Sequence, residues 1–239
     1  MSQVFITGAS RGLGLEFTKQ YLKEGYRVFA CNRKPDRYLE LQELKSKYKE
    51  KLILVDLDVS AQESIDSSFE EISKLTEHLD ILINNAGIRF GGEEKYNDEL
   101  GKLEKEDFNK IFQVNTIAPL MIVEKYLPLL KGDKNSKIIN ISSSSGSITR
   151  RTSKRGGYSY SASKAALNMI TKTLSVDLKE QNIIVISLHP GWVKTTMELT
   201  VNAPLMPEES VNGMRKLIKN LSINDTGKFY DWQGNEMQW

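Results

Sequence analysis

Tyr160 and Lys164 are the residues from which chemistry can first be argued. The string Tyr160-Ser-Ala-Ser-Lys164 lies in an amphipathic stretch, and residues four apart share one face of a helix. A free phenol titrates near ~10, but a cation held beside it stabilises the phenolate and lowers its pKa. Such a phenol can donate a proton to a carbonyl oxygen, or take one from an alcohol, at neutral pH. A Tyr-x-x-x-Lys string can also be plain helix surface, so other features must support this interpretation.

A glycine-rich turn near the start of the chain predicts a phosphate site. The segment Thr7-Gly8-Ala9-Ser10-Arg11-Gly12-Leu13-Gly14 follows an apolar run and opens an amphipathic one. Glycine permits a tight turn and close approach of a phosphate, and a helix N-terminus offers free N–H groups and a positive dipole. We expect a dinucleotide pyrophosphate here, although the spacing is G-x-x-x-G-x-G rather than the commoner G-x-G-x-x-G. The alternative is a turn that uses glycine for geometry alone.

The end of the second apolar run bears on which dinucleotide is bound. It reads Cys31-Asn32-Arg33-Lys34 and lacks the carboxylate that holds the ribose 2′-hydroxyl of NAD. Arg33 suits the 2′-phosphate of NADP(H), and Arg11 from the glycine turn could be a second cation for it. The sequence therefore favours NADP(H) over NAD(H), unless Arg33 and Lys34 simply end a strand in water.

Two polar segments follow later strands. Asp58-Val59 could present a carboxylate to the exocyclic amine of adenine, or Asp58 or Ser60 could cap the next helix. Asn84-Asn85-Ala86-Gly87 offers amides that can tie adjacent loops together, and Gly87 would let the cofactor approach. We expect both segments at the cofactor site.

An α/β framework has to position these segments. Short apolar runs alternate with longer amphipathic ones, which is typical of buried parallel strands joined by helices. We expect a doubly wound parallel sheet of about seven strands with helices on both faces. The expected strands are Val4–Thr7, Val28–Cys31, Leu52–Val55, Ile81–Asn84, Ile138–Ile141, Ile184–Leu188 and a last one at 229–231. The expected helices cover about 13–24, 36–49, 61–78, 106–130, 160–180 and 208–220.

Length and composition narrow the class of protein. The 239 residues suit one large domain spanning 1–239, and 39% hydrophobic with 27% charged residues is typical of a soluble globular protein. No apolar run approaches the ~20 residues that span a bilayer, and the start lacks a secretory pattern. A net charge of +2 is too small to indicate a nucleic-acid partner. We expect a cytoplasmic protein without membrane contact, nucleic-acid partner or metal, and a buried Cys31.

Three segments after strands are expected to shape a substrate crevice, because ligands of open α/β sheets bind beyond the carboxyl ends of the strands. They are residues 89–105, 146–157 and 192–207. A local excess of basic residues in the second segment could attract an anionic substrate or cofactor phosphate, or could simply be solvated. These basic residues are Arg150, Arg151, Lys154 and Arg155.

Six motifs in order make the chain resemble the short-chain dehydrogenase/reductase family over essentially its whole length, which implies a Rossmann-like fold. They are Thr7-Gly8-x3-Gly12-x-Gly14, Asn84-Asn85-Ala86-Gly87, Asn115, Ser142–Ser145, Tyr160-x3-Lys164 and Pro190-Gly191-Trp192-Val193-Lys194-Thr195. Within the family the chain is most similar to the carbonyl-reductase branch that includes the sniffer and C-factor-like proteins. The segment 189–195 and the ending 227–239 carry this similarity.

The resemblance implies roles for the matching residues. Tyr160 would protonate the carbonyl oxygen as hydride arrives from the nicotinamide, and Lys164 would lower the pKa of Tyr160 and hold the ribose hydroxyls. Ser143 would hydrogen-bond the same oxygen, with Ser142 or Ser144 as alternatives. The implied cofactor-binding residues are Gly8, Ser10, Arg11, Gly12, Leu13, Gly14, Asn32, Arg33, Asp58, Val59, Asn85, Ala86, Gly87, Tyr160, Lys164, Pro190, Gly191, Val193 and Thr195.

Asn115 completes the implied catalytic set. Pro119 has no N–H, so the carbonyl of Asn115 lacks its usual helical partner and the helix should bend there. Our hypothesis is that the freed carbonyl holds a water that links Lys164 to solvent and returns a proton to Tyr160. The alternative is a kink that serves packing only.

The implied activity is NADPH-dependent reduction of a ketone, aldehyde or quinone-like carbonyl to an alcohol, or the reverse oxidation. One alternative is an NADP-binding signalling or redox-sensing protein with little turnover, as associated with C-factor-like relatives. Another is a sugar-nucleotide epimerase or dehydratase, which the glycine spacing and the short part after Thr195 disfavour. We expect a homodimer or homotetramer formed through the helices at 106–130 and 160–180.

Overall fold

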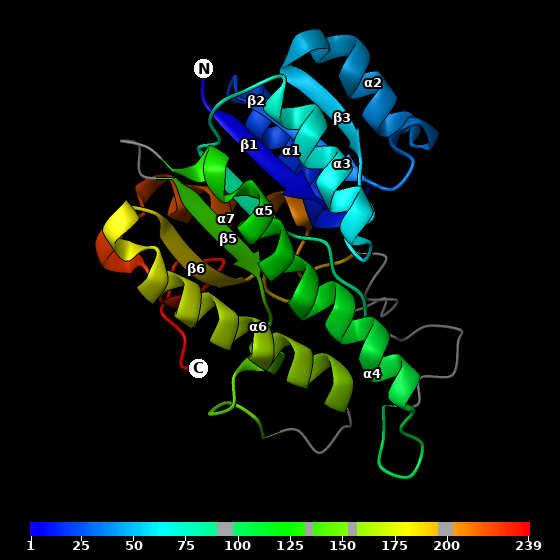
Figure 1. Cartoon of the computed structure of the whole chain (residues 1–239). Coiled ribbons are helices and arrows are strands. Elements are labelled where there is room, and N and C mark those ends of the chain that lie inside the picture. Colours follow the sequence, from blue (N-terminus) through cyan, green and yellow to red (C-terminus); the bar gives the residue numbers. More distant parts are fainter. Residues whose placement is uncertain (90–97, 132–135, 153–156, 196–202) are drawn as a thin grey trace.

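The sheet has seven strands, all parallel, in the order β3-β2-β1-β4-β5-β6-β7 (Figure 1). The computed structural model describes residues 1–89, 98–131, 136–152, 157–195 and 203–239. The strands are β1 (Gln3–Thr7), β2 (Arg27–Asn32), β3 (Leu52–Asp56), β4 (Ile81–Asn84), β5 (Lys137–Ile141), β6 (Ile184–His189) and β7 (Phe229–Asp231). The predicted doubly wound sheet is confirmed. The order reverses between β1 and β4, which opens a crevice at their carboxyl ends.

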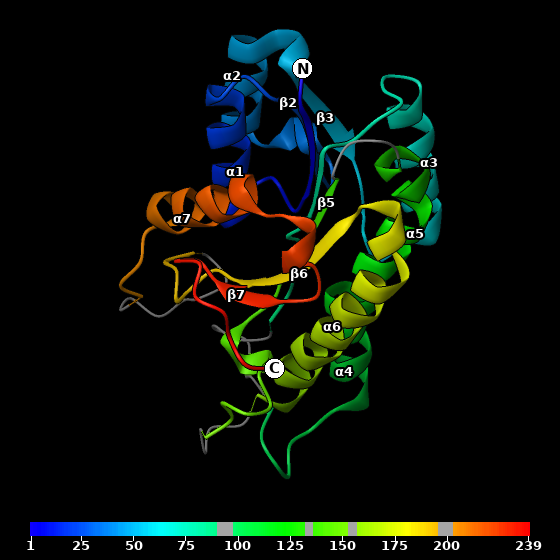
Figure 2. The same ribbon diagram turned by 90° about the vertical axis from the view of Figure 1, so that its left-hand side faces the viewer.

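Helices cover both faces of the sheet (Figure 2). One face carries α1 (Gly12–Lys23), α2 (Leu39–Tyr48) and α7 (Pro207–Asn220). The other carries α3 (Gln62–Ser73), α4 (Lys105–Phe112), α5 (Ala118–Leu130) and α6 (Tyr158–Asp177). Alternate strand residues therefore enter two separate cores: Val4 and Ile6 pack on the α1 side and Phe5 on the α5 side. Because both faces are buried, the strands read as continuous apolar runs.

The helix predicted at 106–130 is interrupted. A π-helical turn, Gln113–Ile117, separates α4 from α5, and the N–H of Ala118 bonds to the carbonyl of Gln113 five residues earlier. Pro119 cannot donate to the carbonyl of Asn115, so the helical ladder has to be rearranged at this point. The regular helix is thus interrupted where a bend was predicted, and Asn115 lies at the centre of the widened turn.

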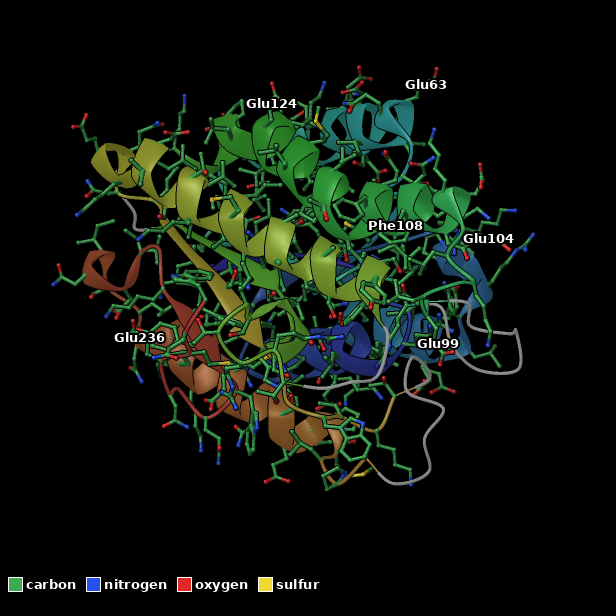
Figure 3. The ribbon with its side chains drawn as sticks, turned by 90° about the horizontal axis from the view of Figure 1, so that it is seen from below. Glu63, Glu99, Glu104, Phe108, Glu124 and Glu236 are labelled. Carbon is green, nitrogen blue, oxygen red and sulfur yellow. The ribbon has the colours of Figure 1, made fainter. Side chains whose placement is uncertain are left out.

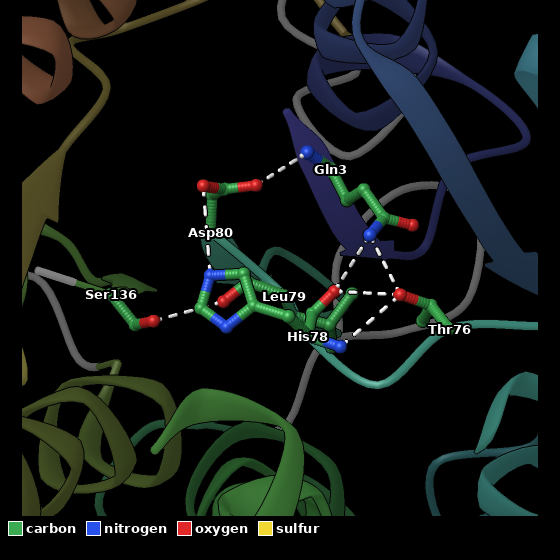
Figure 4. Close-up of polar contacts among 6 residues, drawn as sticks. All are labelled: Gln3, Thr76, His78, Leu79, Asp80 and Ser136. Atoms are coloured by element: carbon green, nitrogen blue, oxygen red, sulfur yellow. Dashed lines mark hydrogen bonds and ion pairs between the residues drawn. The ribbon is translucent and has the colours of Figure 1, made fainter. Parts of the chain in front are cut away.

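Polar groups at the amino-terminal ends of β1, β4 and β5 bond to one another (Figure 4). The backbone N–H of Gln3 donates to Asp80 Oδ2 (2.7 Å), and its side-chain amide donates to Thr76 Oγ1 (2.6 Å). The hydroxyl of Ser136 donates to the carbonyl of Leu79 (3.0 Å). We call this set the amino-edge network: Gln3, Thr76, His78, Leu79, Asp80 and Ser136. It joins three strand starts far apart in the sequence.

Two predictions from the sequence concern the burial of Cys31 and helices that could span a membrane. Cys31 is fully buried, as predicted, and burial raises the pKa of its thiol well above the ordinary value. Among the described helices, none is both long and apolar enough to cross a membrane.

Candidate active site

A cleft of about 880 Å³ opens at the carboxyl ends of the strands. Sixteen of the predicted cofactor residues line it: Gly8, Ser10, Arg11, Gly12, Leu13, Asn32, Arg33, Asp58, Val59, Asn85, Ala86, Gly87, Tyr160, Lys164, Pro190 and Thr195. Five predicted site residues are not in the lining: Gly14, Asn115, Ser143, Gly191 and Val193. The motifs thus meet at one crevice although they are spread over most of the chain.

The glycine turn has the geometry of a phosphate site. Gly8 and Gly12 have positive φ values of 66° and 54°, and a Cβ on Gly8 would come within 2.9 Å of the Cα of Ala86. Arg11 is the extended residue that precedes α1, and no acidic side chain occupies the first turn of this helix. The positive end of the helix dipole is therefore left for an anion in the cleft. Gly14 has a packing role, since a Cβ there would overlap the Gly8 carbonyl oxygen.

Asn85 holds the glycine turn against the end of β4. Its side-chain amide donates to the carbonyl oxygens of Thr7 (2.8 Å) and Gly8 (3.2 Å). In return, the Thr7 hydroxyl oxygen accepts the N–H groups of Asn85 (3.0 Å) and Ala86 (2.9 Å). The predicted tie between adjacent loops is present, and it fixes the two strand ends on either side of the crevice.

The end of β2 offers cations and an unused acceptor. Arg33 and Asn32 line the cleft with Arg11, and the Asn32 amide donates to the Arg33 carbonyl (3.2 Å). The buried Oδ1 of Asn32 has no hydrogen-bond partner among the described residues. The two arginines in the cleft lining fit a ligand bearing an anion. These residues suit a dinucleotide with a phosphate near the adenosine ribose.

The capping alternative for Asp58 and Ser60 is wrong. The residue that precedes α3 is Ala61, and no side chain caps this helix. Instead, Asp58 Oδ1 accepts the N–H (2.9 Å) and the hydroxyl (2.6 Å) of Ser60, which closes a local turn facing the cleft. Partial burial raises the pKa of Asp58, but the bonds from Ser60 and the charge of Arg33 together lower it below the ordinary value. Asp58 is therefore ionised at neutral pH.

Tyr160 and Lys164 enter the cleft together from the first turns of α6. The Nζ atom of Lys164 lies 6.0 Å from the centroid of the Tyr160 ring. The guanidinium carbon of Arg89 lies 5.3 Å from the same centroid. The sequence interpretation placed Arg89 at the start of a crevice segment but not beside Tyr160, because nothing in the sequence indicates that the residue after Ile88 reaches α6. The phenol ring therefore has two cations near it.

Lys164 is a buried cation with a backbone partner. Its side chain is 5% exposed, and Nζ donates to the carbonyl of Ile141 at the end of β5 (2.8 Å). Burial lowers the pKa of Lys164 to about 8. Lys164 is therefore mainly protonated at neutral pH but close enough to its titration to exchange protons. Gly146 packs on the Lys164 backbone, where a Cβ would come within 2.9 Å of its carbonyl oxygen.

Asn115 lies behind the cleft and ties three segments together. Its Oδ1 accepts the N–H of Ile88 (2.8 Å), and its Nδ2 donates to the Ile88 carbonyl (2.8 Å) and to Ser163 Oγ (3.1 Å). Ser163 Oγ in turn donates to the carbonyl of Tyr160 (2.7 Å). The side chain of Asn115 thus joins the widened turn and the segment after β4 to the first turn of α6.

The serine run follows β5 and places its members differently. Ser143 Oγ accepts the N–H of Ser145 (3.1 Å) at the start of the 3-10 turn η4 (Ser144–Gly146), and η4 packs against α6. Ser142 lines the cleft but is buried, and its hydroxyl donates to Asn168 Oδ1 (2.7 Å). The hydroxyl proton of Ser142 is therefore engaged.

The segment after β6 is only partly inside the cleft. Thr195 lines it opposite the glycine turn, where a Cβ on Gly12 would lie 3.4 Å from Thr195 Cγ2. Gly191 has φ +85°, and a Cβ there would meet Leu205 at 2.7 Å. Val193 is buried and forms a bridge with Leu205. Gly191 and Val193 thus shape the backbone that carries Thr195.

The predicted crevice segments are only partly described. Residues 90–97, 153–156 and 196–202 lie outside the described residues, and with them Lys154 and Arg155. In the second segment, the guanidinium of Arg151 donates to Ser161 Oγ (3.1 Å), next to Tyr160.

Helix α4 and the widened turn also line the cleft, which the sequence interpretation missed. Sequence periodicity shows that a helix has two faces, but the sheet and α6 decide which face meets the crevice. The lining residues outside the predicted site set are Tyr38, Leu57, Ser60, Ile88, Asn109, Lys110, Gln113, Val114 and Ile141, whereas Ser142 was predicted only as an alternative to Ser143.

Known proteins resemble this chain along its whole length. The family model for short chain dehydrogenase matches residues 2–205. An NADPH-bound carbonyl reductase from chicken fatty liver is 37% identical to this chain, and the two structures superpose with a TM-score of 0.90. The match covers 100% of this chain and 99% of the reductase chain. The carbonyl reductase Sniffer of Drosophila melanogaster is 32% identical, with a TM-score of 0.91, over 100% of both chains.

One shorter relative is not named as a reductase or dehydrogenase. The C-signal protein of Myxococcus xanthus is 35% identical over 164 residues, which are 67% of this chain and 93% of that protein. The family match covers both the glycine turn and the Tyr160/Lys164 pair, and the solved structures share the complete sheet. The chain belongs to the short-chain dehydrogenase/reductase family.

Proposed function

We propose that this protein is an NADPH-dependent carbonyl reductase that converts a ketone, aldehyde or quinone-like carbonyl into an alcohol. The observation that carries the proposal is that Tyr160 and Lys164 share a cleft with the glycine turn and two arginines. A proton donor and a dinucleotide site in one crevice are what hydride reduction requires.

Tyr160 is the general acid in this proposal. NADPH, when bound, supplies the hydride. Tyr160 donates its phenolic proton to the carbonyl oxygen, and the cations Lys164 and Arg89 favour the phenolate that remains. Ser143 is the second donor to that oxygen, because its Oγ accepts one N–H and keeps its own proton to donate, whereas the proton of Ser142 is engaged.

Lys164 and Asn115 support proton supply. Lys164 has a pKa lowered to about 8 by burial, so its ammonium can pass a proton to Tyr160 and be recharged at neutral pH. The rearranged ladder at Gln113–Ile117 favours a water at the Asn115 carbonyl as the route to solvent. Replacing Pro119 by alanine tests this route, because a restored α-helical bond should slow turnover.

The preference for NADP(H) rests on the end of β2. Arg33 and Arg11 line the cleft, and β2 ends in Asn32 rather than in a carboxylate. The chicken carbonyl reductase, similar over the whole chain, was solved with NADPH bound. Asp58, ionised and in the lining of the same cleft, accepts a hydrogen bond from the adenine amine in this proposal.

Residues 1–239 act as one cytoplasmic domain that associates with copies of itself as a homodimer or homotetramer. One continuous sheet supports the single domain. Apolar side chains exposed on the outer helices support self-association: Met169 and Val176 of α6 are 67% and 66% exposed, and Ile117 is 43% exposed.

Turnover of a carbonyl panel, followed by NADPH absorbance beside NADH, tests the proposal. We expect oxidation of NADPH with at least one carbonyl compound, slower oxidation of NADH, and binding without turnover in Tyr160→Phe. NADPH binding without oxidation, unchanged in Tyr160→Phe, would support a signalling or sensing protein instead. Equal rates with both cofactors would contradict the role of Arg33.

A further inference from the structure

The residue that precedes α6, the helix that carries Tyr160, has no side chain that could cap the first backbone N–H groups of the helix. α6 begins at Tyr158, and the residue before it is Gly157, in a left-handed conformation with φ +77°. Glycine has no side chain to accept the first free N–H groups, and no acidic residue lies in the first turn. These donors need a partner from elsewhere in the fold.

Asp98 supplies that partner from 61 residues away in the sequence. The N–H of Ser159 donates to both carboxylate oxygens of Asp98, at 2.9 Å and 3.0 Å, and the hydroxyl of Ser159 donates to Oδ2 at 2.8 Å. The N–H of Gly157 donates to the backbone carbonyl of Asp98 at 2.8 Å. Asp98 is 5% exposed, so its charge is met by these donors and by the positive end of the helix dipole.

Tyr160 directly follows the residue that Asp98 holds. On the other side, Ser163 binds the Tyr160 carbonyl and is itself held by Asn115. The turn that carries Tyr160 is therefore tied to Asp98 through Ser159 and to Asn115 through Ser163. A phenol has to lie within hydrogen-bond distance of the oxygen it protonates, so a small shift of this turn weakens proton transfer.

We propose that Asp98 is a positioning residue that sets the start of α6 and thereby the place of the Tyr160 phenol in the cleft. It does not line the cleft and touches no reacting atom. The inference rests on the proposed reductase function for its kinetic consequence, but the capping itself can be measured without turnover. The same carboxylate also anchors the segment after residues 90–97 to the catalytic helix.

The test compares Asp98→Ala and Asp98→Asn with the wild type in two measurements. Hydrogen exchange of peptides covering 158–163 should become faster in both variants, because the N–H of Ser159 loses its acceptor or meets an amide that cannot accept at both positions. Per NADPH-binding site, kcat should fall about 10- to 100-fold with the Kd for NADPH unchanged. Asp98→Glu should recover part of this loss, because it keeps a carboxylate.

Glu63→Ala is the matched control. Glu63 is an exposed acid in the first turn of α3, a helix that contributes no lining residue to the cleft, and Figure 3 shows it on the outer side of the molecule. Figure 3 also shows Glu99, the neighbour of Asp98, in the region of the α6 N-terminus. We expect Glu63→Ala to keep kcat and the exchange of 158–163 at wild-type values.

A milder variant keeps the inference testable should Asp98→Ala fail to fold. Ser159→Ala removes one of the three side-chain bonds and should lower kcat two- to fivefold, by about 0.4–1 kcal/mol at RT ≈ 0.59 kcal/mol. Unchanged exchange of 158–163 in the Asp98 variants would overturn the inference, and so would unchanged kcat per binding site. Absence of carbonyl turnover in the wild type would instead refute the proposed function, while exchange would still decide whether Asp98 caps α6.

Discussion

The two ends of the same sheet use polar residues in opposite ways. At the amino-terminal end, the amino-edge network joins β1, β4 and β5 through bonds among its own members, such as Gln3 to Asp80 at 2.7 Å. At the carboxyl end, polar side chains line an 880 Å³ cleft, and the Oδ1 atom of buried Asn32 has no partner among the described residues. The first region is held mainly by bonds within the protein, although Gln3 Oε1 there also lacks a hydrogen-bond partner among the described residues. The second region surrounds a cleft that can take a ligand.

The polar residues at the amino-terminal end of the sheet therefore serve mainly folding stability, and those at the carboxyl end serve ligand binding. A hydrogen bond completed inside the protein contributes ~0.5–1.5 kcal/mol to folding, whereas a buried polar group without a partner lowers stability. At the carboxyl end, the buried ammonium of Lys164 also lowers the folding stability. Its pKa, which burial lowers to about 8, reflects this loss. Substitutions at the carboxyl end should therefore change turnover or cofactor binding, whereas substitutions at the amino-terminal end should change stability alone.

Replacing Lys164 by methionine should give the largest change. Without the ammonium, kcat should fall at least 100-fold, because Tyr160 loses a cation and its proton supply. Stability should rise by up to about 3 kcal/mol at pH 7, since the variant buries no charge.

The pH dependence of this effect follows from the lowered pKa of Lys164. Between about pH 8 and 10.5 the unfolded chain binds more protons at this site than the folded one, so wild-type stability rises with pH there. The stability advantage of Lys164→Met should be largest below pH 8 and shrink toward pH 10.5. Urea unfolding at several pH values measures it, and an advantage that grows with pH would contradict the burial argument.

Arg33→Ala should have the next largest effect and should discriminate between cofactors. Loss of a charge-assisted bond to a phosphate costs ~1.5–3 kcal/mol, which corresponds to a 10- to 100-fold higher KM for NADPH. The KM for NADH should change little. Arg37→Ala, a basic residue outside the cleft lining, is the control, and a loss shared equally by NADPH and NADH would place Arg33 away from the 2′-phosphate.

Asp80→Ala tests the amino-edge network. It removes the acceptor of the Gln3 N–H and the carboxylate that lies 3.6 Å from His78 Nε2, so the free energy of unfolding should fall by about 1–3 kcal/mol. The kcat per binding site should stay at its wild-type value. Asp66→Ala, which removes an acid paired with Lys125 at the surface, should change unfolding much less.

Ser136→Ala should give the smallest effect of this series. The hydroxyl of Ser136 is fully buried and makes one bond to the Leu79 carbonyl, so its loss should cost about 1 kcal/mol. Thermal unfolding and carbonyl turnover together check it. A fall in kcat comparable with that of Lys164→Met would show that the two ends of the sheet are coupled, contrary to their separation in space.

The strands were predicted closely because each is a short apolar run with both faces buried. β4 and β7 begin and end as expected, and the other five strands differ by one residue at one or both ends. The helix expected at 61–78 ends at Ser73, and the one expected at 106–130 contains the π turn that Pro119 indicated. Helix ends are harder to predict because they depend on the neighbours that accept the last backbone groups.

The site was predictable where the chemistry depends on local order along the chain. The glycine turn needs consecutive residues, and the Tyr160/Lys164 pair needs one helical turn. Arg89 and Asp98 could not be predicted in their roles, because their partners are Tyr160 and Ser159, which are more than 60 positions away.

The sequence by itself determined the parallel α/β framework, the glycine turn, the phenol and ammonium on one helix face, and the absence of a carboxylate at the end of the second strand. These features rest on periodicity and backbone geometry within a few residues. The tertiary structure alone decided which face of α4 meets the cleft, that Arg89 joins Lys164 near the Tyr160 ring, and which carboxylate caps α6. Each of those contacts joins segments that only the folded sheet brings within bonding distance.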